Sequence, residues 1–260
     1  MLELYHWEPN IFFLKPLVAL AEKGEPYTAH YFDPTSFQQF EPDFPATDES
    51  SLHLEREGPV LVDDGTVIAS SFFMLEYIAE AFAGPALMPS SPYGRYLVHA
   101  WGQTIALSVA NAVAMLGCAR HLAPTLRLRP SQDLKTRLAS IEPLERRLAW
   151  TAVLDRSEAD AAAAARGQLA SPLRRIEAAL TSSPWLAGTE YSIADIDAFA
   201  MLAPLPELAP ELVNASATPH IAAFLARMHA RPAVRAALAL TRTGRPAHAF
   251  VPGPESARWG

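Results

Sequence analysis

Apolar and polar positions in residues 1–82 change period several times along the chain. They predict a strand, a helix and a second strand, then a loop region, a hairpin and another helix. A strand pair followed by a helix is typical of the end of a thioredoxin-like domain. We therefore expect a small α/β domain in this part of the sequence.

The hairpin is the clearest local signal. Residues 60–62 and 66–68 are rich in β-branched side chains, and Asp64-Gly65 supplies the positive φ angles that a two-residue turn needs. Pro59 has no N–H to give to a ladder, which suits the start of a strand. A cis peptide bond between Gly58 and Pro59 would turn the Gly58 backbone toward a ligand.

Two serines stand directly after the hairpin. Ser70 and Ser71 precede an apolar helical pattern at Met74, Leu75 and Ile78, so one of them is expected to cap a helix. The free N–H groups of such a helix end attract a carboxylate or a phosphate. The stretch from Gly58 to Ser71 therefore predicts a binding site built largely from backbone.

The pattern after the hairpin helix is helical almost throughout. We expect an α/β domain over residues 1–83, a linker rich in turn residues over 84–92, an all-α domain over 93–241 and a C-terminal tail over 242–260. Because the tail contains Gly and Pro without periodicity, it is expected to lie over the surface or hang free. Ser192 to Asp195 matches a capping box that starts a helix of the second domain.

Composition narrows the class of protein. Half of the 260 residues are hydrophobic and 19% are charged, which is ordinary for a folded globular protein. A net charge of -7 without a basic stripe argues against nucleic-acid partners and against anionic membrane surfaces. The longest apolar stretch, 105–119, is interrupted, and no export signal precedes it. A single cysteine suits a reducing cytosol, so we predict a cytoplasmic protein.

Sequence patterns of several other enzyme classes are missing. The eight histidines never stand at metal-ligand spacings such as i, i+4, so we predict no metal. There is no Gly-x-Ser-x-Gly elbow and no Gly-rich phosphate loop, which disfavours hydrolases and nucleotide enzymes. Cys118 lies in an apolar helical run, and we interpret it as a buried, inert thiol rather than a nucleophile.

The order of proline, hairpin and serine-started helix resembles the glutathione-binding half of the glutathione transferase superfamily. Residues 2–7 are similar to that family's first strand, and residues 14–24 are similar to its first helix. The resemblance implies the glutathione transferase fold, in which a thioredoxin-like α/β domain precedes an all-α helical domain. It also implies glutathione as co-substrate and a dimer of identical or related chains.

Four segments resemble the bacterial glutathione-dependent β-aryl-etherases of lignin breakdown more specifically. They lie at residues 14–24, 33–44, 143–150 and 191–196, and together they span nearly the whole chain. The resemblance implies that the glutathione thiolate attacks a β-aryl ether of a lignin-derived aromatic compound and expels a phenolate.

This resemblance also implies a glutathione site. Ser71 matches the serine that binds the γ-glutamyl carboxylate, Gly58 and Pro59 match the backbone pair at the cysteinyl unit, and Gln39 matches a position near the glycyl end. Ser70 replaces the usual acidic or amide side chain at the ligand's amino group, so weaker binding is expected. The structural alternatives are that Ser71 only caps, Pro59 only turns and Gln39 is only exposed.

Activation of the thiol is the point where the sequence departs from the etherase pattern. Phe13 occupies the place of a serine near the ligand's sulfur, and a phenyl ring donates no hydrogen bond. The remaining groups are Asn10, Tyr5 and the backbone amides of the helix start. Asn10 is a catalytic candidate because its amide can donate to a thiolate, although it also suits a plain turn. Trp7 and Phe13 either line an aromatic pocket or belong to the core.

An aromatic substrate needs an apolar wall in the second domain. The candidates are Trp101, Gln103, Asn111 and Met115 on its first helix, and Trp150, which also suits core packing.

Two functions stay open at this point. One is a glutathione transferase of the β-etherase type, which Ser71 and the Pro59 hairpin favour. The other is a catalytically degenerate subunit that completes a heterodimer with an intact related chain, which Phe13 and Ser70 favour.

Overall fold

A four-stranded mixed sheet organises the N-terminal part of the molecule. In the computed structural model, which describes residues 1–41, 44–45, 58–141 and 144–253, the strands lie in the order β2-β1-β3-β4. β1 pairs in parallel with β2 and antiparallel with β3, and β3 pairs antiparallel with β4. The strands are β1 (Leu2–His6), β2 (Thr28–Tyr31), β3 (Val60–Asp63) and β4 (Thr66–Ile68). The predicted thioredoxin-like architecture is confirmed.

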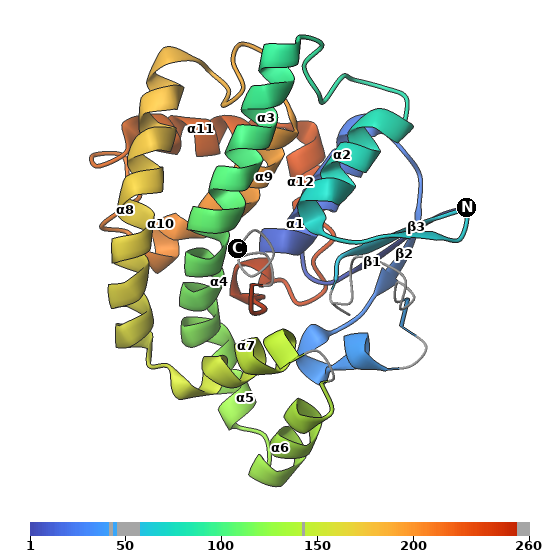
Figure 1. Cartoon of the computed structure of the whole chain (residues 1–260), viewed down its shortest axis with the longest axis vertical. Coiled ribbons are helices and arrows are strands. Elements are labelled where there is room, and N and C mark those ends of the chain that lie inside the picture. The colour runs from blue at the N-terminus through green and yellow to red at the C-terminus, as the bar shows by residue number, and fades with distance from the viewer. Residues whose placement is uncertain (42–43, 46–57, 142–143, 254–260) are drawn as a thin grey trace.

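Two helices separate this sheet from the helical half of the molecule (Figure 1). They are α1 (Ile11–Lys23) and α2 (Ser71–Ala81), which pack against each other. The first ten residues of α1 are all buried, because α9 (Ile193–Leu202) and α12 (Pro232–Leu238) pack against it from the other side. α1 therefore belongs to the cores of both halves, and whatever binds near its start lies close to their junction.

The β3–β4 hairpin forms as its sequence predicts. Val62 pairs with Val67, and the two turn residues Asp64 and Gly65 have φ angles of 46° and 85°. Positive φ at both positions gives the turn the twist that joins two antiparallel strands. The peptide bond between Gly58 and Pro59 is cis.

The second half is all helical. Its longest feature is an unbroken helical run from Pro92 to Arg127, in which two wider π-helical turns separate three α-helical stretches. This run is long and apolar enough to cross a membrane, but 67% of its apolar window is buried inside the protein, as in the core helix of a globular fold. The α-helices are α3 (Pro92–Ile105), α4 (Asn111–Gly117), α5 (Ala123–Arg127), α6 (Ser131–Ala139), α7 (Leu144–Asp155), α8 (Glu158–Ser182), α9, α10 (Leu205–Leu208), α11 (Pro219–Ala230) and α12.

Short turns complete the architecture. The π-helical turns are η3 (Ala106–Ala110) and η4 (Cys118–Leu122), and the 3₁₀ turns are η1 (Pro34–Ser36), η2 (Gln38–Phe40) and η5 (Pro246–His248).

The predicted capping box starts α9. The Asp195 carboxylate accepts hydrogen bonds from the backbone N–H groups of Ser192 and Leu186, at 2.9 Å each. Every residue of α9 is buried. Burial raises the pKa of Asp195 to about 7, against the opposing effect of these hydrogen bonds. The box therefore fixes the start of a central helix, as expected, and its residues lie in the interior of the fold.

The C-terminal residues differ from the sequence-based expectation. The tail was expected to lie over the surface or hang free, but Ala249, Phe250 and Val251 are buried, and Phe250 is wholly inaccessible. The ring of Phe250 packs on Gly117, where an added Cβ would lie 2.0 Å from the ring. Only a glycine in this helix leaves room for the ring. We refer to residues 241–253 as the C-terminal segment; residues 254–260 of the predicted tail lie outside the described residues.

Candidate active site

A buried charge cluster lies directly behind the start of α2. The Lys15 ammonium donates a hydrogen bond to Ser71 Oγ at 2.9 Å and lies 2.8 Å from Asp197 Oδ1. The three residues come from α1, α2 and α9, and all are buried. Because an ammonium group only donates, Ser71 Oγ is the acceptor in its bond to Lys15. A positive charge is thus fixed at the helix end where an anion is expected to bind.

The start of α2 is shaped by the backbone of Ser70. Ser70 is the residue before the helix, with φ of 68° and ψ of 117°, and its hydroxyl makes no capping hydrogen bond. Its carbonyl accepts the N–H of Met74 at 2.9 Å. A positive φ is uncommon for serine and marks a backbone held in an unusual conformation by its surroundings. Ser71, with its side chain on Lys15, is the first helical residue.

Aromatic side chains fill the space beside the cis proline. The rings of Phe13 and Phe32 contact Gly58 so closely that a Cβ there would lie 2.6 Å and 2.5 Å from them. Phe13 also meets Trp7 in an edge-to-face arrangement, with ring centroids 6.1 Å apart. The structure therefore brings Trp7, Phe13 and Gly58 together, and it buries Phe13 almost completely.

Asn10 stands at the start of α1 and faces the C-terminal segment. Its Nδ2 donates to the Ala249 carbonyl at 2.9 Å, which occupies one of the two hydrogens of the amide. The next residue, Ile11, has φ of 36°, an unusual value for a β-branched side chain. The beginning of α1 is thus held in a fixed conformation by a residue 239 positions away.

Gln39 lies buried in η2 instead of exposed. Its Nε2 donates to the Pro34 carbonyl at 3.3 Å. Its Oε1 is buried and has no hydrogen-bond partner among the described residues. In the sequence, Gln39 stands shortly before residues 42–43 and 46–57, which lie outside the described part of the chain, so its predicted role at the glycyl end of glutathione stays a prediction.

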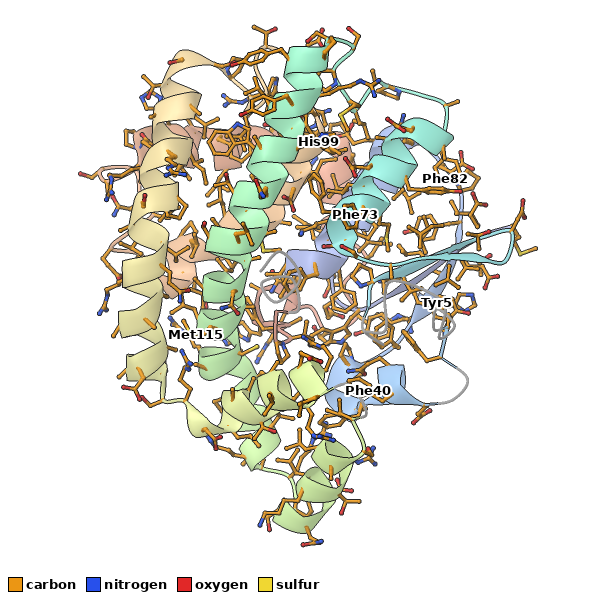
Figure 2. The ribbon with its side chains drawn as sticks, viewed as in Figure 1. Tyr5, Phe40, Phe73, Phe82, His99 and Met115 are labelled. Atoms are coloured by element: carbon orange, nitrogen blue, oxygen red, sulfur yellow. The ribbon has the colours of Figure 1, made fainter. Side chains whose placement is uncertain are left out.

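A pocket of about 190 Å³ opens in the helical half, beneath the end of the C-terminal segment. Figure 2 shows Met115 on the side of α4 that faces α8, and this residue lines the pocket. Asn111, Arg156 and Gln168 supply polar groups, while Pro252 contributes to its rim. Cys118 also lines it, and its thiol is buried, as predicted.

Comparisons with known proteins identify the family. A family model described as the glutathione S-transferase N-terminal domain matches residues 1–80, and one described as the glutathione S-transferase C-terminal domain matches residues 141–232. This chain belongs to the glutathione S-transferase family.

The matches to individual relatives extend over almost the whole length of this transferase. Protein LigF of Sphingobium sp. (strain NBRC 103272 / SYK-6) is 26% identical over 240 residues, which are 90% of this chain and 91% of LigF. The crystal structure of LigF, a β-etherase, matches with a TM-score of 0.83 at 25% identity and covers 92% of this chain and 98% of that one. A glutathione transferase homologue from sulfitobacter, solved with bound glutathione, shares the fold at a TM-score of 0.62 and 19% identity, covering 91% and 96%.

Two of the predicted aromatic residues of this transferase have mainly structural contacts. Trp101 donates from Nε1 to the Leu186 carbonyl at 2.8 Å. Trp150 is fully buried, and its ring centroid lies 5.0 Å from that of Phe37. Trp150 thus joins the helical half to η1 and η2. Neither tryptophan lines the pocket at Met115.

Glu8 is the residue near the site that sequence reasoning missed. It is wholly buried between β1 and α1, and its carboxylate accepts hydrogen bonds from the Tyr31 hydroxyl at 2.7 Å and from the Arg242 and Thr243 amides. The hydroxyls of Thr241 and Thr243 donate to it as well. Burial alone would raise the pKa of Glu8, but these bonds outweigh burial and lower it below its ordinary value. Glu8 thereby anchors the C-terminal segment beside Asn10.

Proposed function

We propose that this transferase binds glutathione across the starts of α1 and α2, with the γ-glutamyl carboxylate at the N-terminus of α2. The observation that carries the proposal is the Lys15–Ser71–Asp197 cluster. A helix N-terminus already favours a carboxylate, and the Lys15 charge behind Ser71 adds to that attraction. Gly58 and the cis Pro59 would hold the cysteinyl unit through backbone groups, as family resemblance implies.

The proposed reaction is the cleavage of a β-aryl ether by the glutathione thiolate. Sulfur forms a bond to the carbon that bears the aryloxy group, the C–O bond breaks, and its electron pair leaves with the phenolate. The thiol proton is released before the attack, and the dipole of α1 favours the thiolate at its N-terminus. Orientation of the two reactants supplies much of the remaining rate enhancement. The support for this substrate class is the similarity to LigF, a β-etherase.

The aromatic part of the substrate is assigned to the pocket at Met115. Its polar groups, Asn111, Gln168 and Arg156, suit the oxygen substituents of a lignin-derived aromatic compound. Asn10 remains the side-chain candidate for a contact with sulfur, through the amide hydrogen that Ala249 does not take.

A second candidate function is supported by Phe13. The ring that replaces the expected serine is buried against Gly58, Phe32 and Trp7, so this chain is also a candidate for the non-catalytic subunit of a heterodimer.

We also propose that the protein is cytoplasmic and that it forms a dimer. The groove between α2 and α3 is the proposed interface. Phe73 and His99 line this groove of about 430 Å³ from opposite helices (Figure 2). The adjacent rings of Tyr93 and Tyr96 are stacked and exposed.

Ser71→Ala is expected to abolish retention of the protein on immobilised glutathione, because it removes the hydroxyl that the ligand carboxylate contacts. The Lys15 ammonium loses one hydrogen bond, which costs about 1.5–3 kcal/mol when the donor is charged. This is less than the roughly 5–15 kcal/mol that stabilises a typical domain, so we expect the variant to stay folded. Retention and the thermal midpoint are measured side by side.

The matched control is Ser91→Ala, which removes a capping hydroxyl at the start of α3. It should keep full retention at a cost of about 1 kcal/mol in stability. Unchanged retention of Ser71→Ala would show that this serine serves only the structure of α2.

A further inference from the structure

Three side chains that can bind a metal ion lie close together around η5, in the C-terminal segment. His121 on η4, Glu207 on α10 and His248 on η5 bring one ligand atom each to within 4.8 Å of the others. His121 Nε2 lies 3.9 Å from Glu207 Oε1. The centroids of the two imidazole rings are 4.3 Å apart. The residues come from three distant parts of the chain, so no motif of fixed spacing predicts the cluster from the sequence.

The Nε2 atom of His121 has a different environment from the Nε2 atoms of His30 and His99. Its Nε2 is buried and has no hydrogen-bond partner among the described residues. By contrast, His30 Nε2 lies 2.7 Å from a Glu3 carboxylate oxygen, and His99 Nε2 lies 2.5 Å from one of Glu76. A buried polar atom without a protein partner calls for an explanation, and coordination of an ion is one such explanation. The wide turn of a π-helix, which presents His121, is frequent at functional sites.

We propose that His121, Glu207 and His248 bind one divalent transition-metal ion of the zinc class. Two imidazole nitrogens and one carboxylate oxygen are ligands that zinc accepts in proteins, with a fourth position left for water.

Metal binding requires side-chain rotations at this site. Bonds of about 2.0–2.2 Å place tetrahedral ligands roughly 3.4 Å apart, less than the present separations. Glu207 and His248 are exposed, and the His248 ring must turn out of its stack on His121 to direct a nitrogen at the ion. The charges of Glu207 and Glu158 near His121 favour a cation, and that of Arg120 opposes it.

The site would fasten the C-terminal segment to the helical half. His248 is followed directly by Ala249, which accepts the Asn10 amide, and by Phe250, which fills the space over Gly117. An ion bound to His248 would therefore help to hold Ala249 and Phe250, the next two residues, in place against the start of α1 and against Gly117. Metal binding is expected to raise the thermal midpoint, because the unfolded chain does not assemble the three ligands.

The test uses tag-free, full-length protein stripped with a chelator and titrated calorimetrically with zinc chloride. We expect one tight site in the wild type. His248→Ala and Glu207→Gln change exposed side chains and leave the fold intact; each should weaken zinc binding by at least about 10-fold, the lower end of the loss seen when even an outer-shell partner is removed. The zinc-dependent rise in thermal midpoint should disappear in both.

His30→Ala is the matched control, because the partly exposed His30 on β2 stands beside a single carboxylate, that of Glu3. It should keep wild-type zinc affinity. Absence of a tight site in the wild type, or unchanged affinity in either His248→Ala or Glu207→Gln, would overturn the three-ligand site.

Discussion

Lys15→Met is expected to destabilise the protein by about 3–5 kcal/mol, the cost of removing one partner from a buried ion pair. Lys15 is fully buried and lies 2.8 Å from Asp197 Oδ1. Without the ammonium group, the protein must either bury the Asp197 carboxylate without the charge that faces it now or protonate that carboxylate, and both cost stability. Urea-induced unfolding followed by circular dichroism gives the free energy of unfolding.

Two further variants make this expectation specific. Lys15→Met/Asp197→Asn removes both charges and should recover at least half of the loss, because a buried charge that has lost the opposite charge beside it is the main cost. Arg137→Met breaks the exposed pair with Asp133 and should cost less than about 1 kcal/mol. A Lys15→Met protein within 1 kcal/mol of the wild type would contradict the assignment of a buried charge cluster behind Ser71.

Phe13→Ala is expected to cost about 3–5 kcal/mol, since it empties a fully packed aromatic site. The Phe13 ring contacts Phe32, Trp7 and Gly58, and its removal takes packing contacts from all three. The same unfolding measurement applies. A loss below 1 kcal/mol would show that the ring does not support the Gly58 backbone.

Phe13→Leu separates the packing role of residue 13 from any role in chemistry. Leucine keeps most of the apolar volume, so the loss of stability should be much smaller than that of Phe13→Ala. Because a phenyl ring donates no hydrogen bond, turnover per folded molecule should not change. A large fall in turnover with intact glutathione binding would contradict activation by the α1 backbone and Asn10.

Local sequence patterns predicted the elements whose causes are local. The hairpin follows from β-branched strands around Asp64-Gly65, and the start of α9 follows from the Ser192–Asp195 spacing. The overall fold came from resemblance, since no local pattern says how a small sheet and a set of helices pack together. The comparisons confirm that inference.

Contacts between residues far apart in the sequence could not be predicted from local sequence patterns. The tail was expected to be irregular because its few apolar residues have no helical or strand period. It is held by contacts with distant residues instead: Phe250 packs on Gly117, and the Glu8 carboxylate accepts hydrogen bonds from residues 241–243. Lys15 was recognised only as part of a family segment, although its partner Asp197 decides its role. The meeting of His121 with His248 depends in the same way on where the C-terminal segment lies.

The proposed ether cleavage is tested by measuring glutathione-dependent release of a phenol from a β-aryl ether by the purified chain alone. The release is followed by absorbance and compared between the wild type and Ser71→Ala. We expect steady turnover by the wild type and its loss in Ser71→Ala. No release by the lone wild-type chain, with release restored only by adding a related transferase chain, would contradict autonomous catalysis and establish the non-catalytic subunit instead.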